Sequence, residues 1–485
     1  MRQEVVSLHQ ILRDLMLARR EQQLPKVIAD MQSRIATIKQ EQIALQAEIE
    51  KRFPAYANLI RPQPPTLAQA RAVLRSGESM VTLYAADSGT YVWAFKKDGP
   101  IAFVSTKMKR TEVEQLVQKL RKALDPGNVD VTNLPVFDLA AAQRLYAELL
   151  VPVASGWQGA NSLLVVANGA LSQLPFAVLP TGASTVKPNP KILYAELQSI
   201  PWLIQKTAIT QLPSANALVA LRKLPVANGQ RAPFVGFGDP QFSMVTAMST
   251  TGTVRNLAIP RLSQRKVAQG ESMDWIQYSQ IPPLPDTRDE ILALAKALKA
   301  DPDRDIFLGT QASKANIMRT DLAKYKIVAF ATHGLLPGDF PGVDQPSLAM
   351  ANPNDGNHGL LTLDDILKLK LDADWVVLSA CNTAAGDGAG SDAVSGLGRG
   401  FFYAGTRALL ATHWPVESLS ARFLVTGIFE RQATNPTLTR AEALRQSMLG
   451  LMQQTEMAVA GQKAYSYAHP LFWAPYALIG DSGAN

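Results

Sequence analysis

The sequence has a single cysteine, Cys381, among its 485 residues. One cysteine excludes a disulfide within the chain and every metal site that needs several thiolates. Two interpretations of Cys381 stay open, an inert buried thiol or a reactive one, because only a thiolate in a suitable environment acts as a nucleophile. The residues around Cys381 indicate which of these two interpretations applies.

Long apolar runs are also missing. No window holds about 18 or more uninterrupted apolar residues, so the sequence predicts no membrane span. A secretory signal needs an apolar segment near the start of the chain, and charged residues interrupt the first 20 positions. We therefore expect a cytoplasmic protein.

Neither the charge nor the histidines indicate a nucleic acid, a metal or a cofactor. Charged residues make up 18% of the chain, and its formal net charge is +7 with a pI near 9.3. The excess is spread out, because residues 1–52 mix both signs and the densest basic run, Lys107–Arg110, is short. The five histidines show no HExxH spacing, and Gly386–Gly390 lacks the Lys-Ser/Thr ending of a phosphate-binding loop. We expect no nucleic-acid partner, no metal and no cofactor.

At 485 residues the chain exceeds the usual size of one hydrophobic core, and it divides into three regions. Residues 1–64 carry apolar side chains at three- and four-residue spacings, which predicts a helical hairpin or coiled-coil-like region divided at Pro25. This region could pack on the rest of the chain or present its apolar face to a partner. Residues 65–284 and 285–485 each predict an α/β half. The stretch 243–284 lacks periodicity and predicts a long exposed loop.

Both halves alternate apolar strands with helices. Near-continuous apolar strands between helices predict a mostly parallel sheet covered on both faces. Strands are expected at 79–85, 91–96, 101–105, 162–167, 234–238, 305–308, 326–332, 374–380, 408–412 and 476–479. Helices are expected at 110–124, 137–150, 287–300, 313–322, 363–369, 393–404, 417–432 and 439–454.

Two of these strands end in residues that carry chemistry, since His333 and Cys381 each directly follow an expected strand. Ligands bind beyond the carboxyl ends of strands in open α/β sheets, so adjacent parallel strands would bring imidazole and thiol to one edge. A histidine deprotonates a thiol and stabilises the thiolate. The backbone N–H groups of Gly334 and Cys381 could form an oxyanion hole. A structural histidine and a core thiol remain the alternative.

Six short motifs around these residues follow one another in order over residues 70–482. They are Leu174–Pro180, Phe330–Gly334, Leu378–Thr383, Ser391–Phe401, Ala411–Val416 and His469–Asp481. These motifs resemble the CHAT family, caspase- and separase-like cysteine peptidases that are often attached to TPR arrays and occur mostly in bacteria. The resemblance implies two caspase-like halves with sheets flanked by helices, a degenerate one at 65–284 and an active one at 285–485.

The resemblance also implies roles for individual residues. His333 matches the catalytic histidine of the family, Cys381 the nucleophile, and Gly334 the donor of an oxyanion N–H. Asp387 and Asp392 match acidic residues that family members carry after the cysteine. Both are candidates for substrate binding, and the alternatives are a solvated loop carboxylate or, for Asp392, a helix N-cap.

A preference for a basic residue before the scissile bond is implied by separase-like relatives. Their acidic pocket falls at Glu417 in this sequence, where a carboxylate could pair with a substrate arginine or lysine. Relatives carry a second acid where this chain has Ser418, and Glu417 could instead open a helix, so both alternatives stay open. His413 either lines the cleft or packs inside, and His469 is expected to be structural.

Residues and resemblance together predict a cysteine endopeptidase that cleaves a protein substrate through the Cys381–His333 pair and a thioester. No acidic third member is expected. A partner protein or a TPR module, in a separate chain or outside this sequence, is expected to activate it by engaging the N-terminal helices or 243–284. The alternatives are an inactive caspase-like scaffold that acts by protein binding, and another acyl-transfer reaction at the same pair of residues.

Overall fold

The computed structural model of the chain describes most residues after position 63. The described ranges are 64–242, 278, 281–337, 343–352, 359–380, 396–456 and 464–483, without 128, 226 and 228, together with scattered helical positions between 26 and 48. The chain divides into two compact units, Met1–Gln63 and Pro64–Asn485. Most of the helical hairpin expected for 1–64, and most of the loop expected at 243–284, lie outside the described residues.

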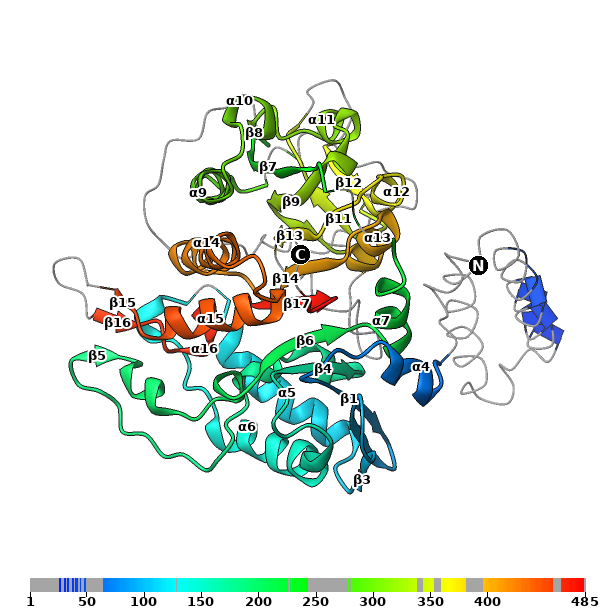
Figure 1. Cartoon of the computed structure of the whole chain (residues 1–485), viewed down its shortest axis with the longest axis vertical. Helices are drawn as coiled ribbons and strands as arrows, with labels where there is room; N and C mark the ends of the chain where they lie inside the picture. The colour runs from blue at the N-terminus through cyan, green and yellow to red at the C-terminus, as the bar shows by residue number, and fades with distance from the viewer. Residues whose placement is uncertain are drawn as a thin grey trace. The chain divides into compact units, whose positions relative to one another are not determined.

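The unit Pro64–Asn485 is built around one large mixed sheet (Figure 1). In the part of the chain that the structure describes, eleven strands lie in the order β3-β2-β1-β4-β6-β17-β14-β13-β9-β7-β8. Their bounds are β1 (Glu78–Ala86), β2 (Gly89–Lys96), β3 (Ala102–Thr106), β4 (Ser162–Ala167), β6 (Ala208–Leu212), β7 (Ala232–Pro240), β8 (Ile306–Gly309), β9 (Tyr325–Ala331), β13 (Trp375–Ser379), β14 (Ala408–Thr412) and β17 (Tyr476–Gly480).

The sheet contains two sets of parallel strands that run in opposite directions. Strands β1, β4, β6 and β17 are parallel to one another, and so are β14, β13, β9, β7 and β8. The sets meet at the antiparallel pair β17–β14, and β1, β2 and β3 form an antiparallel meander at one end of the strand order. The carboxyl ends of the two sets therefore lie at opposite edges of one continuous sheet. The predicted α/β fold with a mostly parallel sheet is confirmed.

Helices cover both faces of the sheet because its strands are apolar on both faces. In β9, Ile327, Ala329 and Ala331 belong to one core, whereas Val328 and Phe330 belong to the other. The first core also contains α5 (Arg110–Leu124), α6 (Leu139–Leu145), α9 (Asp286–Leu298), α14 (Ser418–Thr434), α15 (Arg440–Met452) and α16 (Pro470–Trp473). The second face is covered by α4 (Leu67–Ala72), α7 (Ala215–Leu221), α11 (Lys314–Arg319), α12 (Leu363–Ile366) and α13 (Gly396–Ala404).

Short elements complete this unit. Among the described residues, one small sheet consists of β10 (Gly334–Leu335), β11 (Ser347–Ala349) and β12 (Leu360–Thr362), and another of β5 (Ile192–Leu193), β15 (Thr455–Glu456) and β16 (Ala464–Ser466). A short helix, α10 (Pro302–Asp305), precedes β8. The helix expected at 137–150 is α6 followed by the π-helical turn Tyr146–Leu150. Single 3₁₀ turns lie at Val131–Asn133, Val151–Gly156, Gly169–Gln173, Phe176–Val178, Ala195–Ser199, Leu203–Gln205 and Leu322–Lys324.

The ten strands that the sequence predicts are present within two residues at either end. The sequence does not predict β6 or α7. Thr210 and Gln211 interrupt the apolar run of β6, although both are buried, so the signal of a buried strand is lost. The helix α7 spans only Ala215–Leu221, which is too short for a clear helical period.

Three residues near the end of the expected exposed loop 243–284 are buried, namely Tyr278, Ile281 and Leu284. Tyr278 is 0% exposed and Ile281 is 2% exposed. The hydroxyl of Tyr278 donates to the carbonyl of Met350 at a distance of 2.5 Å. The prediction of exposure is therefore wrong here, because isolated apolar residues without a period do not reveal that they pack on a distant segment.

His469 is a structural residue, as the sequence predicts. Its Nδ1 accepts the N–H of Leu471 at 3.2 Å and caps α16, and its ring packs on Tyr194 with the centroids 5.1 Å apart. The side chain is buried, and burial lowers the pKa of the imidazole to about 4. The neutral imidazole is therefore part of the native packing.

Replacing His469 by Asn tests this burial. Asn also accepts a hydrogen bond at a helix N-cap, but it has no proton to gain. In the native state the pKa of His469 is about 4, against 6.5 for an ordinary histidine. Between these pH values the unfolded chain binds a proton that the native state excludes. The free energy of unfolding therefore falls as the pH falls.

Urea unfolding at about pH 7 and about pH 5 measures this difference. We expect the His469→Asn variant to lose about 2 kcal/mol less than the unchanged protein over this interval, since one pH unit is worth about 1.4 kcal/mol for one group. Equal losses in both proteins would contradict the burial of the neutral ring.

Candidate active site

The two strands that precede the predicted reactive residues are neighbours. β9 and β13 pair in parallel, with Ala331 opposite Ser379 at their last paired positions. His333 lies two residues beyond Ala331, and Cys381 follows Ser379 by two residues in the sequence. The carboxyl ends of the two strands meet at one edge of the sheet, as the predicted pair requires. Outside the described residues lie Cys381, Asp387 and Asp392.

Both neighbouring strands hold the chain immediately before Cys381. The backbone N–H of Thr332 donates to the carbonyl of Ser379 at 3.2 Å. From the other side, the hydroxyl of Thr412 at the end of β14 donates to the carbonyl of Ala380 at 2.5 Å. The backbone that leads into Cys381 is therefore fixed on both sides.

His333 is almost fully enclosed, with 1% of its surface exposed. Its Nε2 lies 2.8 Å from the carbonyl oxygen of Pro282, and its ring packs on Phe242 with the centroids 5.7 Å apart. Because a carbonyl oxygen only accepts hydrogen bonds, Nε2 carries the proton, and Nδ1 is the basic nitrogen of the neutral ring. The Pro282 carbonyl thus fixes both the orientation and the tautomer of the imidazole.

The sequence predicts no acidic partner for His333, and the structure has a backbone carbonyl in that place. A third group that orients the base is typical of a nucleophile–base pair. Pro282 gives no signal in the sequence, because every residue has a carbonyl. Its place is set by buried neighbours, Ile281 and Tyr278. Burial raises the pKa of Tyr278, so its hydroxyl keeps the proton that it donates to Met350.

A small sheet holds the turn around His333. Gly334 opens β10 and pairs with Leu348 of β11. The carbonyl of His333 accepts the N–H of Ala349 at 3.0 Å, and the hydroxyl of Thr332 donates to the carbonyl of Ala349. The backbone on both sides of the imidazole is therefore held by hydrogen bonds to β11.

A buried chain of polar side chains lies under the end of β13. The hydroxyl of Ser379 donates to Glu290 Oε2 at 3.1 Å and lies 2.9 Å from the hydroxyl of Tyr476. Glu290 comes from α9 and Tyr476 from β17, and each of the three is at most 2% exposed. Because the proton of Ser379 goes to the carboxylate, Tyr476 donates to Ser379. In the sequence, only Ser379 within an apolar strand indicates these hydrogen bonds, since a buried hydroxyl needs a partner.

A model of the CHAT domain family matches residues 139–481. This chain belongs to the CHAT domain family. The resemblance that the sequence motifs carry is therefore confirmed. A search of curated proteins finds no match to the sequence.

Solved structures similar to this CHAT protein include separase and gingipain. Separase from Saccharomyces cerevisiae, in its complex with securin, has 10% identity and a TM-score of 0.46, over 98% of this chain and 37% of that chain. The Arg-specific cysteine proteinase gingipain R has 10% identity and a TM-score of 0.34, over 77% and 73%. Porphyromonas gingivalis RgpB, in a complex of its pro- and mature domains, has 9% identity and a TM-score of 0.38, over 77% and 76%. This chain spans much less than half of the separase chain, and likenesses of this strength carry no argument about function.

Glu417 of the CHAT protein caps the helix that follows it. Its two carboxylate oxygens accept the N–H groups of Leu419 at 3.0 Å and Ser420 at 2.7 Å, and 7% of the residue is exposed. This is the helix-opening role that the sequence leaves open beside substrate binding. The hydroxyl of Ser418 donates to Asp286 Oδ2 at 2.6 Å, which brings a second carboxylate close to the start of α14.

His413 of the CHAT protein is packed inside. None of its surface is exposed. Burial lowers the pKa of its imidazole to about 3, and the positive charge of Arg121 adds to this effect. Arg121 also donates to the carbonyl of His413 at 3.1 Å, which joins α5 to the end of β14. The ring is neutral at physiological pH and has the packed role that the sequence gives as one alternative.

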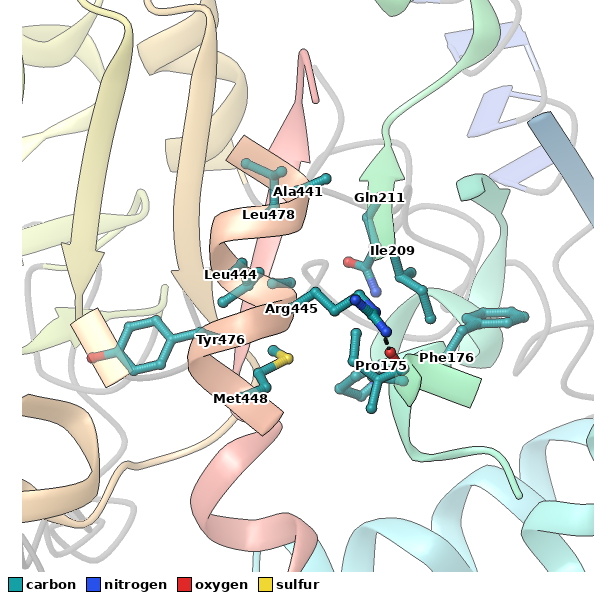
Figure 2. A pocket seen from close by; sticks show the side chains of 13 residues that line it. Pro175, Phe176, Ile209, Gln211, Ala441, Leu444, Arg445, Met448, Tyr476 and Leu478 are labelled. Atoms are coloured by element: carbon teal, nitrogen blue, oxygen red, sulfur yellow. Dashed lines mark hydrogen bonds between the residues drawn. The ribbon is translucent and has the colours of Figure 1, made fainter. Parts of the chain in front are cut away.

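A small cavity between α15, β17 and β6 is too small for a substrate (Figure 2). Its volume is about 20 Å³, which accommodates one water molecule. The side chains of Gln211 and Arg445 lie along its wall, and Tyr476 extends away from them toward the polar chain under β13 (Figure 2). This cavity is therefore no candidate binding site for a molecule larger than water.

Neither a metal centre nor a membrane segment is found in the described ranges of the CHAT protein. Within those ranges, no three His, Cys, Asp or Glu side chains gather as metal ligands. None of the described helices has both the length and the apolar character that a bilayer crossing requires.

The polar chain under β13 predicts unequal costs for two substitutions. Ser379→Ala removes a hydroxyl that two buried groups share, so we expect the free energy of unfolding to fall by about 2–3 kcal/mol. Tyr476→Phe removes one hydrogen bond and leaves that of Ser379 to Glu290, so we expect about 1 kcal/mol. Urea unfolding checks both values, with Tyr84→Phe as a control because Tyr84 is 53% exposed. A Ser379→Ala variant as stable as the control would contradict the arrangement.

Proposed function

We propose that this CHAT protein is a cysteine endopeptidase that cleaves a protein substrate, with Cys381 as nucleophile and His333 as general base. The pairing of β9 with β13 supports this most, because the last paired residues, Ala331 and Ser379, each precede a reactive residue by two positions. Neighbouring strands lie about 4.8 Å apart, which sets the spacing expected for the two groups. A thiol beside an imidazole loses its proton at neutral pH.

The proposed reaction starts from the tautomer of His333. Nδ1 takes the proton of the Cys381 thiol, and the sulfur attacks the carbonyl carbon of the scissile bond. The N–H groups of Gly334 and Cys381 stabilise the negative oxygen of the tetrahedral intermediate. His333 returns the proton to the leaving amine, and the carbon–nitrogen bond breaks to give a thioester. The same imidazole then deprotonates water, which hydrolyses the thioester and restores the thiol.

The Pro282 carbonyl supports His333 in two ways in this proposal. It binds the Nε2–H at 2.8 Å, so Nδ1 remains the nitrogen that exchanges the proton. Its partial negative charge also stabilises the imidazolium that forms when the thiol is deprotonated. An acidic side chain is not needed for either role.

We propose that acidic side chains of the protein bind a basic substrate residue that precedes the scissile bond. The candidates remain Asp387, Asp392 and Glu417. Asp286 joins them, because its hydrogen bond to Ser418 brings a carboxylate to the place where relatives carry a second acid. Two carboxylates close together attract a guanidinium or ammonium group of a substrate. The two N–H groups that Glu417 accepts fix its carboxylate in place.

The enclosure of His333 supports control by a partner. With 1% of the residue exposed, a peptide carbonyl does not reach the imidazole in this arrangement. Phe242 packs on the ring, opposite in role to the Pro282 carbonyl that orients it. We therefore propose that a protein or a TPR module activates the peptidase in the cytoplasm by moving Phe242 off the ring, while the Pro282 carbonyl stays bound to Nε2.

The single cysteine makes a direct test of the pair practical, since any thiol label on the chain is on Cys381. A thiol paired with an imidazole reacts well below the ordinary cysteine pKa of about 8.5. We expect alkylation at about pH 6 to slow by about 100-fold in His333→Ala, and the His469→Asn variant to react like the unchanged protein. Intact-mass spectrometry measures both rates.

A peptide-library digest then identifies the reaction. We expect cleavage after basic residues by the unchanged protein with its activator, and none by Cys381→Ala. Histidine-dependent labelling without cleavage would instead indicate another acyl-transfer reaction. Labelling that is slow and independent of His333 would indicate an inactive scaffold and refute the peptidase.

The role of the Pro282 carbonyl is tested through its anchor, Tyr278. Tyr278→Phe removes the hydrogen bond to Met350, so the segment is held less firmly and the imidazole less well oriented. We expect alkylation of Cys381 at about pH 6 to slow by about tenfold, because small misplacements of a catalytic group are costly. Tyr146→Phe is the matched control, since Tyr146 is buried but belongs to the helical layer over the first strand set. Equal rates in the two variants would argue against this role.

A further inference from the structure

A second hollow lies at the edge of the sheet opposite the candidate active site. It is a cleft of about 660 Å³. Lys326 and Asp374 line it where β9 and β13 begin, and Asp481 lines it where β17 ends. Its cationic residues come from both strand sets and their connections: Arg75, Arg222, Arg231, Lys326, Arg407 and Arg440.

The cations of this cleft outnumber the carboxylates that pair with them. Four arginines each have a carboxylate within 3 Å: Arg222 with Glu78 at 2.6 Å, Arg75 with Asp481 at 2.7 Å, Arg231 with Asp374 at 2.8 Å and Arg407 with Asp372 at 2.9 Å. These four pairs account for four of the six cations of the cleft. The other two, Arg440 and Lys326, have no carboxylate within 3 Å among the described residues.

Arg440 is the most enclosed of the six, with 1% of the residue exposed. Its nearest carboxylate oxygens, on Asp374 and Asp481, are both 3.8 Å away. Its Nη1 donates to backbone carbonyls, and its Nε has no hydrogen-bond partner in the part of the chain that the structure describes. Burial lowers the pKa of its guanidinium to about 10, which is the sign of a charge that its surroundings compensate incompletely.

An ion network that only stabilises the fold accounts for these contacts less well than a binding site for an anion does. A buried charge is costly unless it is paired, so a network that serves stability alone balances its charges. Here the incompletely paired guanidinium of Arg440 lines an open cleft. The volume of this cleft lies within the range of small-molecule sites, which is about 300–1,000 Å³. Leu224, Pro225 and Phe429 add apolar wall beside the cations.

We propose that this cleft binds a phosphorylated small molecule with at least two negative charges, and that Arg440 and Lys326 supply the uncompensated positive charge. A guanidinium presents several N–H groups in one plane, which matches the oxygens of a phosphate. The apolar wall fits an organic part of the ligand, such as a nucleoside. This site is separate from the proposed peptidase site and does not depend on it.

Binding to the full chain tests the proposal, with inorganic pyrophosphate and metal-free ATP as probes and sodium sulfate at equal ionic strength as the salt control. Calorimetry measures the affinity and thermal unfolding the stabilisation, since a ligand of the native state raises the midpoint. We expect pyrophosphate or ATP to bind, and ATP to bind more tightly if a nucleoside lies on the apolar wall. Binding of pyrophosphate alone would keep the phosphate site and exclude the nucleoside.

Substitutions locate the site. Lys326→Gln removes a partly buried cation without breaking any of the four close pairs, so the fold is retained, and we expect the affinity to fall at least fivefold. Lys324→Gln is the matched control two residues away, because Lys324 is 76% exposed and does not line the cleft. Arg440→Met is expected to weaken binding further. No binding of either probe, equal stabilisation by sulfate, or unchanged affinity in Lys326→Gln would each overturn the proposal.

Discussion

The parallel pairing of β9 with β13 is the constraint on which the candidate active site depends. His333 and Cys381 are 48 positions apart in the sequence, and only the sheet brings the residues before them into register. This register is maintained by apolar side chains on both faces, because a parallel sheet needs both faces covered. Local hydrogen bonds from Thr332 and Thr412 then fix the last residue of β13, Ser379, and the residue after it, Ala380. The two hydrophobic cores, rather than His333 and Cys381 themselves, therefore position the candidate site.

Apolar runs made most of this fold predictable from the sequence. The strands around His333 and Cys381 are continuous apolar segments that end in polar residues, which is a local signal. The Pro282 carbonyl gives no such signal, because the backbone is the same at every position and only the tertiary packing selects this one. Glu290 and Tyr476 escape prediction for a related reason: each looks ordinary in its own helix or strand, and only the fold joins them through a serine.

The reversal of direction at the β17–β14 pair gives the two edges of the sheet different characters. The second set of strands ends at the edge where His333 lies and begins at the edge with the arginine cleft. At that second edge the amino ends of one set lie beside the carboxyl end of β17. Segments from both sets therefore contribute charged side chains there, and Arg440 of α15 lies 3.8 Å from a carboxylate of each set, Asp374 before β13 and Asp481 after β17. One sheet thus separates the edge of the candidate active site from a charged edge.

The place of β17 in the sheet has a consequence for the synthesis of the protein. β17 follows the other ten strands in the sequence, yet it lies between β6 and β14 in the interior of the sheet. Until the ribosome has released residues 476–480, β6 and β14 each have an open side with unpaired backbone groups. Neither strand set can dock on the other before that moment, so the nascent chain has to wait with two exposed sheet edges. Chaperones that shield such edges would be most needed between the synthesis of β14 and that of β17.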